Sequence, residues 1–177
     1  MDTIKTIGHS THNIGIFTGL LKKHNIEIVA DVRTVPKSRH APQFNLEIFP
    51  DFLYKEKIGY IHLPELGGFR HAKKDSINTG WKNMSFRGYA DYMQTDEFSR
   101  GIDMLMNLAE RHHVAIMCAE ALPYRCHRSL IADALLARGA TVFHIMTDGK
   151  SIEHKMTDFA LVKDGRVSYP NIECRQT

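Results

Sequence analysis

The hydrophobic residues of this chain fall into short continuous runs that alternate with stretches in which they recur every three or four positions. The first kind is typical of buried strands and the second of amphipathic helices. The strand-like runs are Ile4–His9, Glu27–Val32, Tyr60–Leu63, Val114–Cys118 and Thr141–Met146. The helix-like stretches are Ile14–His24, Leu46–Ile58, Asp96–His112 and Ser129–Arg138. This alternation predicts an α/β fold with three layers, in which a mostly parallel sheet of about five strands has helices on both faces.

Turn and capping residues agree with this order. Asn13 can cap the first helix, and Gly139 follows the last one as a typical C-terminal cap. The pair Asp164-Gly165 predicts a small C-terminal hairpin within Val162–Val167. No repeat, low-complexity segment or Gly/Pro/Ser-rich linker divides the sequence. We therefore expect residues 1–177 to form a single α/β domain.

Polar and reactive residues follow the predicted strands. His9 ends the first strand, Arg33 follows the second, and Cys118 and Glu120 follow the fourth. The carboxyl ends of parallel strands meet at one edge of a sheet, where open α/β folds bind ligands. Two long, polar segments, 34–45 and 64–88, leave the same edge, and loops of this length are commonly functional. We expect one site there.

The stretch from Val114 to Ser129 is the most informative. A buried strand delivers Cys118 and Glu120 to the edge, and Cys126-His127-Arg128 then opens a helix. A helix start favours an anion or a thiolate and should lower the pKa of Cys126. The alternative interpretation is that both cysteines are buried and inert.

Arginines and an aromatic residue in the loops are candidates for substrate binding. The guanidinium groups of Arg33 and Arg39 match carboxylate or phosphate. For Arg33, a structural ion pair with Asp31 or Glu120 is the alternative. Trp81 is either a stacking platform for a base or an anchor for its loop. The other candidate substrate-binding residues are Ser38, Asn45 and Arg128.

Composition narrows the class of protein. The share of hydrophobic residues, 43%, is ordinary for a folded protein, and no apolar run approaches the ~20 residues that span a bilayer. The N-terminus lacks a signal-peptide pattern, so we expect a cytoplasmic protein with reduced cysteines and no membrane partner. The net charge of +3 and pI of about 8.7 are mildly basic, short of a dedicated nucleic-acid domain.

Seven segments together resemble the proteins classed as domain of unknown function family 488 (DUF488). They are TIGHST from Thr6, DVRTVPKSR from Asp31, Phe44-Asn45, LGG from Leu66, FRGYADYM from Phe86, MCAE from Met117 and CHRSLIADAL from Cys126. This resemblance spans nearly the whole chain and implies no settled activity.

A weaker likeness is to rhodanese-type sulfurtransferases and cysteine phosphatases, which share a strand, a cysteine, a short loop and an arginine at a helix start. Here nine residues separate Cys118 from Arg128 and six separate it from Arg125. Pro123 also stands where those loops carry glycine. These departures weaken the analogy of a phosphate-cradling loop around Cys118, and fold-level analogy transfers no reaction.

Our leading hypothesis is an enzyme acting on a phosphorylated, nucleotide or nucleic-acid substrate. Arg33, Arg39 and Arg128 would hold the anion. Glu120 or His9 would serve as general acid/base, and Cys126 or Cys118 as nucleophile or structural thiol.

Two hypotheses come from other classes. One is a non-catalytic module that binds a nucleotide or nucleic acid. The other is a metal-binding protein with ligands among His9, Cys118, Glu120, Cys126 and His127, although no C-x-x-C or H-x₃-H spacing supports a metal site. For the enzyme and for the binding module, the expected partner is a small anionic ligand or a nucleic acid. For the metal-binding protein, it is a metal ion. The sequence specifies no cofactor, reaction type or oligomeric state.

Overall fold

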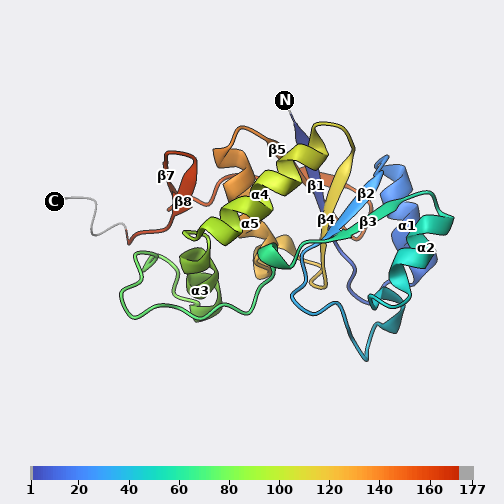
Figure 1. The fold of residues 1–177 in the computed structure, drawn as a ribbon, viewed down its shortest axis with the longest axis horizontal. Coiled ribbons are helices and arrows are strands. Elements are labelled where there is room, and N and C mark those ends of the chain that lie inside the picture. The colour runs from blue at the N-terminus through green and yellow to red at the C-terminus, as the bar shows by residue number, and fades with distance from the viewer. Residues whose placement is uncertain (1, 172–177) are drawn as a thin grey trace.

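Six strands form one sheet in the computed structural model, which describes residues 2–171 (Figure 1). Their order across the sheet is β3-β2-β4-β1-β5-β6. The first five of these are mutually parallel, and β6 runs antiparallel to β5. The strands are β1 (Thr3–Gly8), β2 (Ile28–Asp31), β3 (Gly59–His62), β4 (Val114–Cys118), β5 (Thr141–Ile145) and β6 (Ser151–Glu153). The α/β class and the mostly parallel sheet are confirmed. The additional strand β6 was not predicted because its three residues are all exposed and carry no strand pattern.

Helices cover both faces of the sheet (Figure 1). They are α1 (Ile14–Lys23), α2 (Phe49–Lys55), α3 (Met84–Tyr92), α4 (Asp96–Ala109) and α5 (Arg128–Ala137). Helices α1 and α2 pack on one face, and α3, α4 and α5 share the core of the other. Side chains alternate between these cores along β4: Ile116 and Cys118 belong to the α5 side, Ala115 and Met117 to the α1 side. This alternation directs Cys118 toward α5.

The ends of several elements differ from the sequence prediction. The helix predicted over Leu46–Ile58 begins only at Phe49, with Pro50 in its first turn and Ile48 at its N-cap. Helix α3 begins at Met84, which shortens the predicted loop 64–88. The C-terminal hairpin is confirmed as β7 (Leu161–Lys163) and β8 (Arg166–Ser168). Its turn residues Asp164 and Gly165 both have positive φ, as a two-residue hairpin turn requires.

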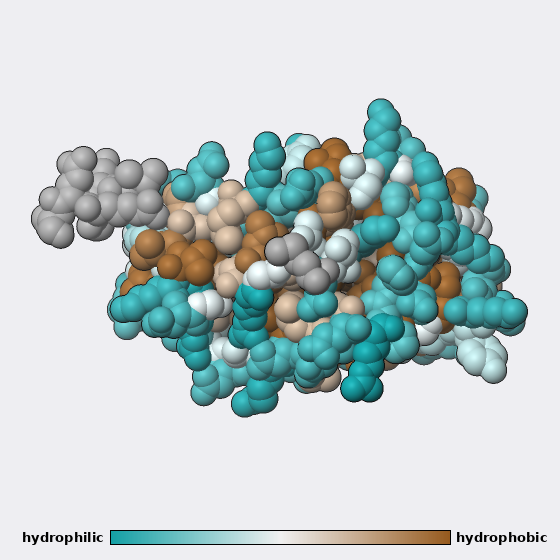
Figure 2. All heavy atoms as spheres, turned by 90° about the horizontal axis from the view of Figure 1, so that it is seen from above, coloured by the Kyte–Doolittle hydropathy of each residue, from teal (hydrophilic) through white to brown (hydrophobic). Residues whose placement is uncertain are grey.

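No helix within residues 2–171 is long and apolar enough to cross a membrane. Seen from above, the surface is largely hydrophilic, and hydrophobic residues appear in separate patches (Figure 2). Cytoplasmic location stays a prediction.

Candidate functional site

A cavity of about 590 Å³ lies at the carboxyl edge of the sheet. The five residues expected to converge there all line it: His9 after β1, Arg33 after β2, Cys118 and Glu120 at the end of β4, and Cys126 before α5. Ser38 lines it as well. The structure therefore brings together side chains that are more than a hundred residues apart in sequence, because parallel strands end at one edge.

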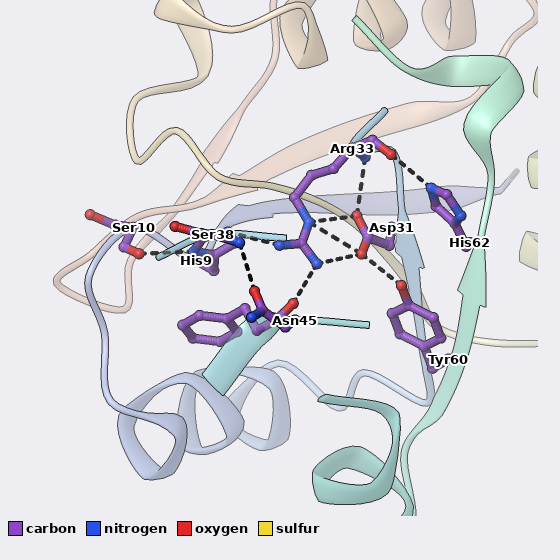
Figure 3. A network of polar contacts seen from close by, with 9 residues as sticks. His9, Ser10, Asp31, Arg33, Ser38, Asn45, Tyr60 and His62 are labelled. Atoms are coloured by element: carbon purple, nitrogen blue, oxygen red, sulfur yellow. Dashed lines mark hydrogen bonds and ion pairs between the residues drawn. The ribbon is translucent and has the colours of Figure 1, made fainter. Parts of the chain in front are cut away.

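Arg33 forms a buried ion pair with Asp31 (Figure 3). Its Nη2 donates to Asp31 Oδ2 at 2.7 Å and to the Phe44 carbonyl at 2.7 Å, and its Nε donates to Asp31 Oδ1 at 2.9 Å. The Tyr60 hydroxyl also donates to Asp31 Oδ2, at 2.7 Å. This is the structural pair that the sequence left open for Arg33. The Asp31 carboxylate balances most of the positive charge of Arg33, so Arg33 has little net charge left with which to hold an anion.

His9 is fixed in orientation and neutral at pH 7. Its Nδ1 donates to the Ser10 carbonyl at 2.8 Å, so its Nε2 is left as an acceptor, 3.3 Å from Nη1 of Arg33 (Figure 3). The ring stacks on Phe44 with centroids 4.4 Å apart. Burial, aided by the Arg33 charge, lowers the pKa of His9 to about 4. His9 therefore helps to hold the Arg33 side chain in place. Its Nε2 already has Arg33 as a partner, so it is poorly placed to act as a general base.

Cys118 and Cys126 form a contact that no sequence spacing revealed. Cys126 Sγ lies 3.0 Å from Cys118 Sγ, and both side chains are buried. Burial raises the pKa of Cys118, but the hydrogen bond from Cys126 and the charge of Arg128 outweigh it and lower that pKa. The same contact, together with burial, raises the pKa of Cys126. The lowering expected at Cys126 from the helix start is wrong, and Cys118 is the more acidic thiol. Cys174 lies outside the described residues.

Arg128 is a buried cation behind the two thiols. It is 1% exposed, and its Nη2 donates to the carbonyl oxygens of Glu120 at 3.1 Å and Ala121 at 3.2 Å. Its Nε and Nη1 have no hydrogen-bond partner, and it forms no ion pair within residues 2–171. An uncompensated buried charge is costly and is relieved by an anion. A thiolate on Cys118 is such an anion.

His127 completes the thiol cluster. Its Nε2 lies 3.3 Å from the Val32 carbonyl and donates to it, which leaves Nδ1 as an acceptor 3.5 Å from Cys126 Sγ. Burial, with the charge of Arg128, lowers the pKa of His127 to about 4, so the ring is neutral at pH 7. His127 is thus a neutral hydrogen-bond acceptor beside Cys126.

Three cations at the cavity were not among the predicted site residues. Lys37, Arg70 and Arg125 line it, and none forms an ion pair within residues 2–171. The Arg70 guanidinium lies 3.6 Å from the centre of the Tyr92 ring, and its Nε donates to the Gly67 carbonyl. The cavity therefore presents positive charge above the thiols.

The loop that carries Arg70 is tied to α3. The Asp91 carboxylate accepts hydrogen bonds from the Lys73 backbone N–H and the Asn78 side chain, both at 2.8 Å. Gly88 allows the loop to touch the helix, since a Cβ there would lie 2.1 Å from the Arg70 carbonyl oxygen. These contacts hold the loop that carries Phe69 and Arg70 in place.

Phe69 is an exposed aromatic residue on the cavity wall. It is 91% exposed, and its φ of +59° lies in the left-handed region that a bulky residue seldom adopts. Such a conformation persists only where the surroundings enforce it, and it is common at binding sites.

Four of the predicted substrate-binding residues do not line the cavity. Arg39 is exposed on its loop, and Arg128 lies behind the cysteines. Asn45 accepts a hydrogen bond from the Ser38 backbone at 2.7 Å and so shapes the loop (Figure 3). Trp81 packs against an aromatic cluster, which favours the loop-anchor interpretation over base stacking. Its partners are Phe86, Phe159 and Tyr169.

Metal binding receives no geometric support in the described part of the chain. Among residues 2–171, no group of three or more His, Cys, Asp or Glu side chains is arranged to hold a metal ion. The candidate site is thus a pair of thiols that line the same cavity as three cations.

Comparison with known proteins assigns the chain to a family. No curated protein and no solved structure matches it, so the likeness to rhodanese-type sulfurtransferases and cysteine phosphatases stays a prediction. The family model described as Domain of unknown function DUF488 matches residues 13–135. That match contains the two cysteines, Arg33, Arg70 and Arg125, and it covers more than half of the 177 residues. The chain therefore belongs to the DUF488 family.

Proposed function

We propose that this protein is an enzyme that acts on a phosphorylated, nucleotide-like substrate, with Cys118 as its nucleophile. One observation carries the proposal: the Cys118 thiol, which lies 3.0 Å from Cys126 Sγ and close to the buried Arg128 charge that lowers its pKa, lines the same cavity as Lys37, Arg70 and Arg125. A thiolate is the reactive form of cysteine, and a cavity lined by cations concentrates anions beside it.

The anion side of the proposal rests on unbalanced charge. Among the described residues that line the cavity, Glu120 is the one carboxylate, against Lys37, Arg70 and Arg125. Arg33 is balanced by Asp31 and adds little. We therefore assign anion binding to the three cations at the cavity in place of Arg33, Arg39 and Arg128.

Phe69 supports a substrate that carries a planar ring. An exposed phenyl group at the cavity wall offers a face on which a base can stack, and base–aromatic stacking contributes about 1–3 kcal/mol. A phosphate between the cations and a ring against Phe69 describe a nucleotide, free or within a nucleic acid.

Glu120 is the residue best placed for proton transfer. It lies two residues after Cys118, faces the cavity and is exposed to solvent, and its Oε1 accepts a hydrogen bond from the Leu122 backbone. His9 is less suited, because Arg33 occupies its free nitrogen. The thiolate would displace the leaving oxygen from phosphorus, and Glu120 would exchange protons with that oxygen and with the water that later releases the phosphate.

The test combines binding with turnover. Inorganic phosphate, titrated against chloride at matched ionic strength, should raise the melting temperature. At a phosphate concentration of a hundred times its Kd, the free energy of unfolding should rise by about 2.7 kcal/mol. Arg70→Gln and Arg125→Gln should weaken this shift, and Arg39→Gln, an exposed arginine outside the cavity lining, is the matched control.

Turnover is measured as phosphate released from p-nitrophenyl phosphate and nucleoside monophosphates. Cys118→Ser should abolish release and keep the phosphate-dependent thermal shift. A wild-type protein with no phosphate-specific shift, or a Cys118→Ser variant with undiminished turnover, contradicts the proposal. A shift without turnover in the wild type favours the non-catalytic binding module.

A further inference from the structure

The proposed nucleophile has a second thiol beside it that the reaction above does not use. Cys118 ends β4 and Cys126 lies just before α5, with seven residues between them. Their side chains are 2% and 8% exposed, both line the cavity, and their Sγ atoms lie 3.0 Å apart. A disulfide has an S–S length of about 2.05 Å, so closure needs an approach of about 1 Å.

Few packed side chains of the connecting loop oppose that adjustment, although hydrogen bonds from Arg128 and from the Ser10 N–H hold its backbone near Cys118. Ala119, Glu120, Tyr124 and Arg125 are all exposed, and of residues 119–125 only Pro123 is buried. The loop therefore contributes little to the core, and a small shift of Cys126 toward Cys118 disturbs few packed side chains.

The two thiols differ in the way that a thiol exchange reaction needs. Cys118 is the more acidic, because Cys126 donates to it and the Arg128 charge lies nearby. Cys126 keeps its proton chiefly because of Cys118. That cause disappears once Cys118 is bonded to another sulfur. The Arg128 backbone N–H, 3.5 Å from Cys126 Sγ, then stabilises a thiolate on Cys126, and His127 Nδ1 stands 3.5 Å away as acceptor.

We propose that Cys118 and Cys126 form a reversible disulfide by exchange with low-molecular-weight disulfides, Cys118 attacking and Cys126 resolving. In the first step the Cys118 thiolate bonds to one sulfur of RSSR and expels RS⁻. In the second, Cys126 bonds to Cys118 Sγ as its proton passes to the departing sulfur, which leaves as RSH. The protein loses two electrons, and RSSR is reduced to two thiols.

This exchange goes beyond the proposed function and also regulates it. A Cys118 held in a disulfide has no thiolate, so oxidation would switch the proposed enzyme off, and a dithiol reductant would restore it. Only this regulatory consequence rests on the proposed function, since the disulfide itself needs no phosphorylated substrate.

The experiment follows the disulfide directly. The folded protein, with Cys174→Ser in every variant to remove the third thiol, is incubated with oxidised glutathione, and free thiols are then blocked with N-ethylmaleimide. Intact mass and peptide mapping report the products. We expect the Cys118/Cys126 form to lose both free thiols through a 118–126 crosslink that dithiothreitol reverses.

Single variants separate the two roles. Cys126→Ser should accumulate glutathione on Cys118, because the resolving thiol is missing. Cys118→Ser should form no crosslink, and any glutathione that Cys126 takes up should stay on it as a mixed disulfide, since no second thiol is present to displace it. Stable glutathione on Cys118 with Cys126 present, or no reaction at Cys118, overturns the inference. A crosslink in a protein that releases no phosphate would overturn the proposed function alone, and phosphate release without a crosslink would overturn the exchange alone.

Discussion

Replacing Arg33 by methionine tests how much the buried ion pair stabilises the fold. The change keeps an unbranched, flexible side chain but removes the guanidinium group, with three hydrogen bonds to Asp31 and one to the Phe44 carbonyl. Asp31 is fully buried and, among the described residues, would keep only the Tyr60 hydroxyl and one backbone N–H as hydrogen-bond donors. Stranding one partner of a buried pair costs about 3–5 kcal/mol. For a chain of this size that lowers the melting temperature by roughly 6–20 °C.

Urea unfolding followed by circular dichroism measures the loss. Arg39→Met is the matched control on the same loop, and we expect it to change the free energy of unfolding by less than about 0.5 kcal/mol because Arg39 is exposed. The double variant Asp31→Asn/Arg33→Met should recover part of the loss, since no buried charge is left unpaired. An Arg33→Met protein as stable as Arg39→Met would refute the structural role given to Arg33.

Two further predictions concern pH and the loop that carries Arg70. Burial, with the charges of His154 and Arg128, lowers the pKa of His144 from 6.5 to about 3, so the unfolded chain binds this proton first and stability falls as pH drops from 6.5 toward 3. Between about pH 6 and 4, the His144→Gln variant should lose about 1.4 kcal/mol less per pH unit than the wild type, and equal slopes would contradict the assignment. Gly88→Ala should destabilise the protein by about 1–3 kcal/mol and weaken phosphate binding, because its Cβ would meet the Arg70 carbonyl at 2.1 Å. Gly19→Ala in α1 is the control, because a Cβ there would meet no atom within 4 Å, and it should stabilise the protein by about 0.5–1 kcal/mol. The same change in stability for both variants would show that the close approach at Gly88 does not matter.

The sequence predicted which residues meet at the carboxyl edge of the sheet better than it predicted where their side chains point. Parallel strands must end together, so His9, Arg33, Cys118 and Cys126 could be placed near one another from their order alone. The contact between the two thiols could not, because the path of the seven-residue loop sets it. That contact also reversed the pKa expected for Cys126 from the helix start.

Loop residues escaped prediction for a related reason. Arg39 and Arg70 both lie in polar segments without periodicity, and nothing in their sequence neighbourhoods distinguishes the exposed arginine from the one that lines the cavity. Trp81 was ambiguous until its aromatic partners, up to 88 residues away, were known. Side-chain direction in a loop depends on tertiary contacts such as those of Asp91, which no local pattern encodes.

The rate at which Cys118 is alkylated, measured against pH with iodoacetate and with iodoacetamide, tests the central claim most directly. Peptide mapping follows the alkylation of Cys118, and each rate is divided by the rate at which the same reagent alkylates the thiol of glutathione. A thiolate beneath Arg70 and Arg125 predicts an apparent pKa below the ordinary value of about 8.5 and a preference for the anionic reagent that Arg70→Gln and Arg125→Gln remove. An apparent pKa at or above that of free cysteine, with no preference for iodoacetate, would contradict a reactive thiolate in an anion-binding cavity.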